Sequence, residues 1–121
     1  MNAATNIVKK YGLKQCEACV TALCLKLSGL VLVIDVRYLT HTRPFIIHKT
    51  LFPDSAISDT GLHYGFLIEG IVYDNLHHSG IKKNEWLSNF LFFNPRIGRE
   101  AVITNEQVKE ITSQQFLSRK K

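Results

Sequence analysis

The sequence predicts one α+β domain over residues 1–121, in which an N-terminal cysteine-bearing helix packs on a small antiparallel sheet and further helices follow. Three observations support this fold class. Apolar residues recur with helical spacing between positions 15 and 28, β-rich runs follow at 30–36 and 62–68, and Glu69-Gly70 separates the second run from an apolar return segment. A helical period followed by strands joined through tight turns is typical of an α+β domain.

The composition suits a single globular core. The chain has 121 residues, of which 45% are hydrophobic and 21% are charged, close to the globular averages. No apolar run approaches the roughly 18 residues of a membrane span, so we expect no membrane partner. Residues 1–10 lack the apolar segment of a signal peptide, which predicts a cytoplasmic protein or a piece cut from a larger protein that carried the targeting signal.

Charge and cysteine content narrow the function classes. The net charge of +5 is mildly basic, but no aromatic-basic recognition motif accompanies it, so nucleic acid is a disfavoured partner. All three cysteines lie between Cys16 and Cys24. An odd, clustered set makes a poor disulfide framework, and we expect reduced thiols.

The first half of the chain predicts one helix and two strands. Residues 1–13 are polar and mixed. The segment 15–28 has one apolar face, and Ser28-Gly29 ends it as a C-terminal glycine does. Residues 30–36 read as a strand, residues 44–48 as a short second strand, and residues 50–61 as a loop rich in proline, aspartate, serine and glycine.

The second half begins with a predicted hairpin. Residues 62–68 form its first strand, Glu69-Gly70 its turn and residues 71–74 its second strand. Residues 82–92 then read as a helix with Trp86 facing inward.

The C-terminal residues predict one more strand and one more helix. Residues 99–103 form the strand. Thr104 and Gln107 have the spacing of a capping box, so a helix is expected from Thr104 onward, with Val108 and Ile111 on one face.

Cys16 is a candidate nucleophile because it lies in the first turn of its helix. The backbone N–H groups of that turn have no helical partner and favour a thiolate, the reactive form of cysteine. Cys19 and Cys24 lie deeper in the helix and read as core residues. From position alone, Cys16 could equally be a core residue.

His63 is a candidate base, and strand parity gives it a partner. Side chains alternate along a strand, so His63 shares a face with Gly65, which leaves space beside the imidazole. With a two-residue turn at Glu69-Gly70, Asp74 falls on the same face as His63, one diagonal step away. A carboxylate there would orient the imidazole as a base. Asn75 would reach His63 only if the turn held an odd number of residues.

Two other interpretations of Cys16 and Cys19 are open, because the pair spells C-x-x-C. A thioredoxin-like redox pair follows a β-strand, which residues 11–15 do not resemble. A zinc half-site needs a second ligand pair, and His77-His78 is the only adjacent histidine pair. The remaining histidines, His41 and His48, lie in or beside predicted loops, where His77 and His78 are also expected.

The motifs taken together resemble the papain-fold toxin family of bacterial polymorphic toxin systems. The resemblance covers roughly residues 11–92 and leaves 95–121 as a C-terminal extension. It is carried by the following segments, in this order: Gln15-Cys16-Glu17-Ala18-Cys19 opening a helix, His63-Tyr64-Gly65-Phe66 in a strand, Tyr73-Asp74-Asn75, Ser79-Gly80-Ile81 and Glu85-Trp86-Leu87-Ser88-Asn89-Phe90.

The resemblance implies a papain-like core and a catalytic site with defined roles. Cys16 would be the nucleophile, His63 the general base, and Asp74 the group that orients His63, with Asn75 able to substitute. It also implies acyl transfer without cofactor or metal, by a toxin effector that acts on a protein substrate. Such an effector would be delivered into a target-cell cytoplasm as part of a larger secreted protein, and a cognate immunity protein could neutralise it.

One departure from the papain-like pattern concerns the oxyanion hole. Larger papain-like proteases place a glutamine several residues before the cysteine, whereas here Gln15 directly precedes Cys16. That leaves the Cys16 backbone N–H as the one assigned donor. The sequence does not separate peptidase from glutamine deamidase or transglutaminase chemistry. The competing function class is a catalytically inactive papain-like binding module that holds a protein partner.

Overall fold

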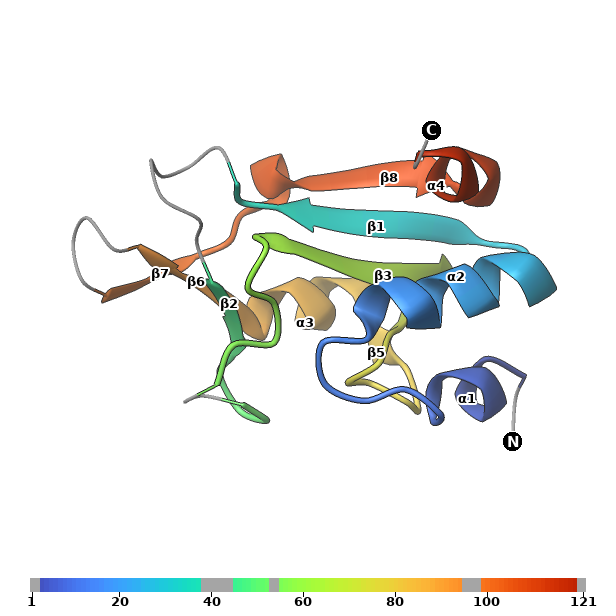
Figure 1. The fold of residues 1–121 in the computed structure, drawn as a ribbon, viewed down its shortest axis with the longest axis horizontal. Helices are drawn as coiled ribbons and strands as arrows, with labels where there is room; N and C mark the ends of the chain where they lie inside the picture. The colour runs from blue at the N-terminus through green and yellow to red at the C-terminus, as the bar shows by residue number, and fades with distance from the viewer. Residues whose placement is uncertain (1–2, 38–44, 53–54, 95–98, 120–121) are drawn as a thin grey trace.

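The computed structural model describes residues 3–37, 45–52, 55–94 and 99–119 (Figure 1). The elements follow one another along the chain as α1 (Ala3–Val8), α2 (Cys16–Lys26), β1 (Leu30–Asp35), β2 (Phe45–His48), β3 (Leu62–Ile68), β4 (Ile71–Tyr73), β5 (Ile81–Lys82), α3 (Lys83–Ser88), β6 (Phe90–Asn94), β7 (Arg99–Val102), the 3₁₀ turn η1 (Asn105–Gln107), β8 (Val108–Thr112) and α4 (Ser113–Ser118). The fold is therefore α+β, as predicted.

The strands form two antiparallel sheets rather than the one expected. The larger sheet has five strands in the order β5-β4-β3-β1-β8, and the smaller has three in the order β2-β6-β7. Figure 1 shows α2 running along the larger sheet, with β6 and β7 extending from one end. The larger sheet therefore has two faces that other elements can cover.

Two hydrophobic clusters cover these two faces. Along β1, Val31 belongs to a cluster that contains residues of α1, α2 and α4, whereas the next residue, Leu32, belongs to a second cluster. The second cluster also contains Trp86 from α3 together with Ile46 and Phe92 from the smaller sheet. The alternation of strand side chains thus places three helices on one face and α3 with the smaller sheet on the other.

The hairpin between β3 and β4 has the predicted register. Ile68 pairs with Ile71, and the turn residues Glu69 and Gly70 have φ values of 50° and 83°. Two consecutive residues with positive φ suit a two-residue turn whose twist matches the strands. The β3–β4 pairing stops at Phe66 and Tyr73, so β4 does not cover the first half of β3.

The predicted helix at 82–92 is wrong at both ends. Residues 81–82 form β5, α3 ends at Ser88, and residues 90–94 form β6. Phe90 and Phe92 are both buried and alternate with the half-buried Leu91, which is a strand pattern. Pairing with β2 on one side and β7 on the other completes the strand.

The predicted helix from Thr104 is also wrong. Thr104 and Gln107 do form a capping box, but it closes only the turn η1. The next residues form β8, which pairs with β1, and the one α-helix of this part, α4, begins at Ser113. Arg119 at the end of α4 forms an ion pair with Glu17 in the first turn of α2.

Two smaller differences concern the first half of the chain. Residues 1–13 contain a short helix, α1, which buries Ala4 and Val8 one turn apart. The predicted strand at 44–48 is β2, and residue 44 lies outside the described residues. The loop at 50–61 is confirmed where it is described, and no helix of the described residues is long and apolar enough to cross a bilayer.

Candidate active site

Cys16 is the first residue of α2, and a tight loop immediately before it sets its position. Lys14 has a φ of 64°, the left-handed conformation, and the Gln15 side chain accepts a 2.6 Å hydrogen bond from the N–H of Gly12. The Gln15 side-chain oxygen is therefore engaged with the loop. Cys16 is buried, and the backbone of Tyr64 in β3 is among the groups that lower the pKa of its thiol.

The pKa of the Cys16 thiol is lowered from its ordinary value of 9.0. Burial by itself raises this pKa. Three influences together outweigh burial: the charge of His63, the contact of the His63 side chain with the thiol, and the backbone of Tyr64. His63 shows the reciprocal effect. Burial lowers the pKa of His63, and the Cys16 charge and the Asp74 hydrogen bond raise it to about 9. A thiolate–imidazolium pair is therefore favoured near neutral pH.

His63 and Asp74 are joined as the strand parity predicts. The imidazole Nε2 lies 2.9 Å from Oδ2 of Asp74, and both side chains are fully buried. Since a carboxylate only accepts, Nε2 donates and the neutral ring has its lone pair on Nδ1. Among the described residues Nδ1 has no partner at ordinary hydrogen-bond geometry, so its contact with the Cys16 sulfur is looser than a standard hydrogen bond. Catalytic contacts often tighten only when substrate binds.

Asp74 is held as an anion by donors on both oxygens. Oδ1 accepts from the backbone N–H groups of Leu76 (2.9 Å) and His77 (2.7 Å) and from Nδ1 of His77 (2.9 Å). Oδ2 accepts from His63 and from the indole Nε1 of Trp86 at 2.8 Å. Burial raises the pKa of this carboxyl, but the hydrogen bonds from His63 and His77 more than offset it and hold the pKa far below its usual range.

Asn75 makes a different contact from Asp74. Its Nδ2 donates a 2.7 Å hydrogen bond to the carbonyl of Gly12, in the loop that precedes Cys16. His78 contacts the same loop, with Nε2 3.2 Å from the Tyr11 carbonyl. These two side chains therefore tie the loop after β4 to the loop before α2. The geometry gives the His63 partner role to Asp74 and gives Asn75 a part in holding the Cys16 loop.

Gly65 has a more specific role than leaving space for His63. A Cβ at position 65 would lie 2.7 Å from Val72 and 2.8 Å from the Trp86 ring. The indole fills this gap, stacks on the His63 ring with centroids 6.0 Å apart, and reaches Asp74. The missing side chain thus lets Trp86 close one side of the site and keep water away from it.

We expect Gly65→Ala to displace Trp86 and to cost about 1–3 kcal/mol of unfolding free energy, the usual penalty for overpacking a core. Thermal unfolding measures this loss, and loss of turnover should accompany it because the indole leaves Asp74. Gly12→Ala is the matched control, since a Cβ there meets only Gln15, at 3.8 Å. Equal melting temperatures for the two variants would contradict this role for Gly65.

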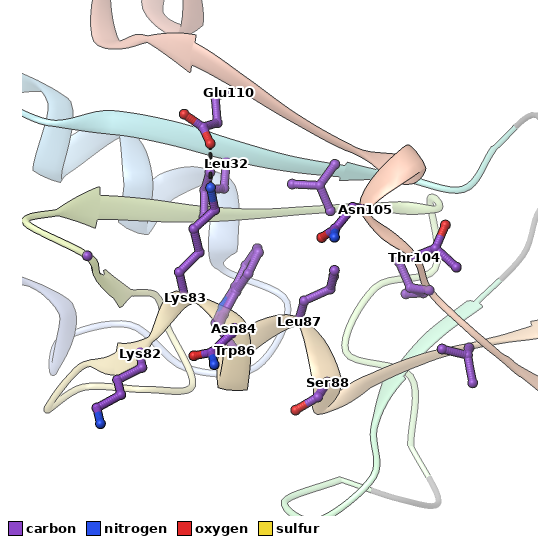
Figure 2. Close-up of a pocket in the computed structure, with 14 residues that line it drawn as sticks. Leu32, Lys82, Lys83, Asn84, Trp86, Leu87, Ser88, Thr104, Asn105 and Glu110 are labelled. Carbon is purple, nitrogen blue, oxygen red and sulfur yellow. Dashed lines mark hydrogen bonds and ion pairs between the residues drawn. The ribbon is translucent and has the colours of Figure 1, made fainter.

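Cys16 opens into a cleft of about 240 Å³. Its walls come from the start of α2, the start of β3 and the 57–60 loop, with Lys14, Ile57, Asp59 and Tyr64 among the lining residues. A larger cavity of about 950 Å³ lies between α3 and the η1–β8 segment (Figure 2). Trp86 lines the larger cavity, whereas Cys16 lines the smaller cleft.

The structure changes the interpretation of His48 and His77. His48 is the last residue of β2, beside the loop that follows, and it is 2% exposed rather than solvated. His77 is not a solvated loop residue either, because its ring bonds to Asp74. The one local signal was the Asp-x-x-His spacing of Asp74 and His77, which suits a turn closed by the aspartate. His41 lies outside the described residues.

The other cysteines do not share the features of Cys16. Cys19 is fully buried, and burial with the nearby negative charges raises its pKa to about 12. Burial also raises the pKa of Cys24. All three cysteines are free thiols, which excludes a Cys16–Cys19 disulfide in this structure. In the part of the chain that the structure describes, no group of three or more potential ligands is arranged to hold a metal.

Comparison with family models agrees with the resemblance seen in the sequence. Residues 1–91 match the model described as papain fold toxin 2. Searches of curated proteins and of solved structures returned no match. The matched segment contains Cys16, His63 and Asp74 and ends within β6, before β7, β8 and α4. The match covers well over half of the sequence, and the chain belongs to the papain fold toxin 2 family.

Proposed function

We propose that this chain is a cysteine-nucleophile acyl-transfer enzyme, a peptidase or a glutamine deamidase or transglutaminase, which acts as a bacterial toxin effector on a protein substrate. One observation carries the proposal. The thiol of Cys16 lies beside a buried His63 that is bonded to Asp74, and its pKa is lowered despite burial. Nucleophilic cysteines have this combination, whereas structural buried cysteines have raised pKa values.

In the proposed reaction, protons move between Cys16, His63 and the leaving group. Nδ1 of His63 takes the Cys16 proton, and the thiolate attacks a carbonyl or carboxamide carbon of the substrate. The Cys16 backbone N–H stabilises the developing oxyanion. The imidazolium, held through Nε2 by Asp74, then protonates the departing amine or ammonia and leaves an acyl thioester. Water gives hydrolysis or deamidation, and a substrate amine gives transamidation.

The cleft suits a protein side chain or a short extended segment. Its inner wall includes Ile57 and Tyr64, and its rim includes Lys14 and Asp59, whose charged groups are 3.4 Å apart. Both rim side chains are about half exposed, so their ion pair contributes little stability and can open for a substrate. The substrate in this proposal is a protein that presents an accessible carbonyl or carboxamide group.

Expression of the chain in a bacterial cytoplasm tests the proposal. We expect the wild type to slow growth and Cys16→Ala to abolish that effect, because only Cys16 can form the thioester. Cys24→Ala is the control, since Cys24 lies two turns further along α2 and should leave the toxicity in place.

Equal growth inhibition by the wild type and Cys16→Ala would instead favour the papain-like binding module. The proposal further expects a cognate immunity protein that binds the chain and restores growth. It places the chain in a target-cell cytoplasm, delivered there as part of a larger secreted protein.

A further inference from the structure

Two imidazoles continue the hydrogen-bonded line of the site beyond Asp74. Nδ1 of His77 lies 2.9 Å from Oδ1 of Asp74, and Nε2 of His77 lies 3.0 Å from Nε2 of His48. His48 is 2% exposed, and the His77 side chain is 10% exposed. The line therefore runs from His63 in β3 of the larger sheet, through Asp74 and His77, to His48 in β2 of the smaller sheet.

The tautomers of His48 and His77 follow from the hydrogen bonds of His48. Nδ1 of His48 accepts from the backbone N–H groups of Leu51 (3.1 Å) and Thr50 (3.3 Å). A nitrogen that accepts has no proton, so neutral His48 has its hydrogen on Nε2. Among the described residues, Nε2 of His77 is the acceptor for that hydrogen, which puts the His77 hydrogen on Nδ1, facing Asp74. Each ring thus fixes the tautomer of the next.

Burial keeps the end of the line uncharged. Burial lowers the pKa of the His48 imidazole to about 4. The electrostatic effects of His77 and His63 also lower this pKa, whereas that of Asp74 raises it. The carboxylate of Asp74 therefore accepts from Nδ1 of His77 at Oδ1 and from Nε2 of His63 at Oδ2.

We infer that His77 and His48 are positioning residues of the catalytic site, which hold Asp74 with Oδ2 directed at His63. This inference rests on the proposed function, because it assigns the line to the Cys16 nucleophile. The backbone donors at Oδ1 belong to the same loop as Asp74 and move with it. His48 is different, because it anchors the line on β2, a strand far away in sequence.

Substitutions at His77 test whether this residue positions Asp74 through a hydrogen bond or only fills space beside it. Asparagine places an amide N–H where Nδ1 lies and keeps the donor to Asp74, whereas leucine removes it. In His77→Leu we expect the pKa of Cys16, read from the pH dependence of its alkylation, to rise by about one unit, and the rate near pH 6 to fall about tenfold. His77→Asn should restore part of that rate and not all of it, because the amide keeps the donor to Asp74 but loses the bond to His48. An unchanged or lowered pKa in His77→Leu would overturn the inference, because losing a donor without losing position makes Asp74 a stronger partner for His63.

A second measurement does not depend on catalysis or on a mutant that folds. Nitrogen-15 spectra of the wild-type imidazoles near pH 7 should show His48 as the Nε2–H tautomer and His77 as the Nδ1–H tautomer. The opposite tautomer at His77 would overturn the inference whatever the alkylation shows. If the tautomers are as expected but Cys16 is no more reactive than Cys24, the proposed function fails, and the positioning role fails with it.

Discussion

Iodoacetamide is expected to alkylate Cys16 more than about a thousandfold faster than Cys19 at pH 7. The pKa of Cys19 is about 12, so only about one molecule in 10⁵ is the thiolate at that pH. The pKa of Cys16 lies below 9.0, so its thiolate fraction is above about one in a hundred. Cys24 should also react slowly, because burial raises its pKa. Peptide mapping after brief labelling measures all three rates in one sample.

The His63→Gln variant tests the cause of this reactivity. Without the imidazolium, burial becomes the dominant influence on Cys16 and raises its pKa above the ordinary value, so labelling at pH 7 should fall to the level of Cys24. The pH dependence separates the two groups further. Labelling should stay fast above pH 9, whereas turnover should fall there, since His63 loses the proton that the leaving amine needs. Equal labelling of the three cysteines in the wild type would contradict a catalytic thiolate.

The parts of the fold that local patterns determine were predicted correctly. The apolar face of α2, the strands β1 and β3 and the turn at Glu69-Gly70 each follow from a period or a turn signal within a few residues. The hairpin register then fixed which side chain meets His63. The contact between Asp74 and His63 could be predicted because only a short strand segment and a turn separate the two residues in sequence.

The errors arose where tertiary contacts decide the structure. Val108 and Ile111 are three residues apart, a spacing that suits one face of a helix. In β8 they lie on opposite faces, because Val108 packs with the second hydrophobic cluster and Ile111 with the first. A strand that packs one apolar side chain on each face can therefore imitate a helical pattern. Likewise, β6 is a strand because β2 and β7 flank it, which no local pattern records.

Dependence on tertiary contacts also explains which contacts of the site were not predicted. The contact of His48 with His77 depends on how β2 is placed against the core, so no spacing in the sequence predicts it. Trp86 was expected to face inward, but its bond to Asp74 depends on the gap at Gly65. Asn75 was a reasonable alternative to Asp74 until the turn proved to have two residues.

Asp74→Asn is expected to lower turnover by about 10²- to 10⁴-fold and unfolding free energy by about 2–4 kcal/mol. The carboxylate accepts on both oxygens, whereas an amide has only one acceptor atom. If the amide nitrogen faces His63, the imidazole must accept there and move its hydrogen to Nδ1, which removes the base that Cys16 needs. If the amide nitrogen faces Leu76 instead, its N–H group and the backbone N–H of Leu76 point at one another with no acceptor between them.

Asn75→Ala is the matched comparison, because it changes the next residue and removes a single hydrogen bond to Gly12. We expect it to lower stability by about 1–2 kcal/mol and turnover by less than about tenfold, through a looser Cys16 loop. Asp74→Ala should be the least stable of the three, since the donors from His63, His77 and Trp86 would all lose their acceptor. Kinetics and thermal unfolding on the same preparations give both rankings. A larger loss of turnover in Asn75→Ala than in Asp74→Asn would show that Asp74 is not the group that orients His63.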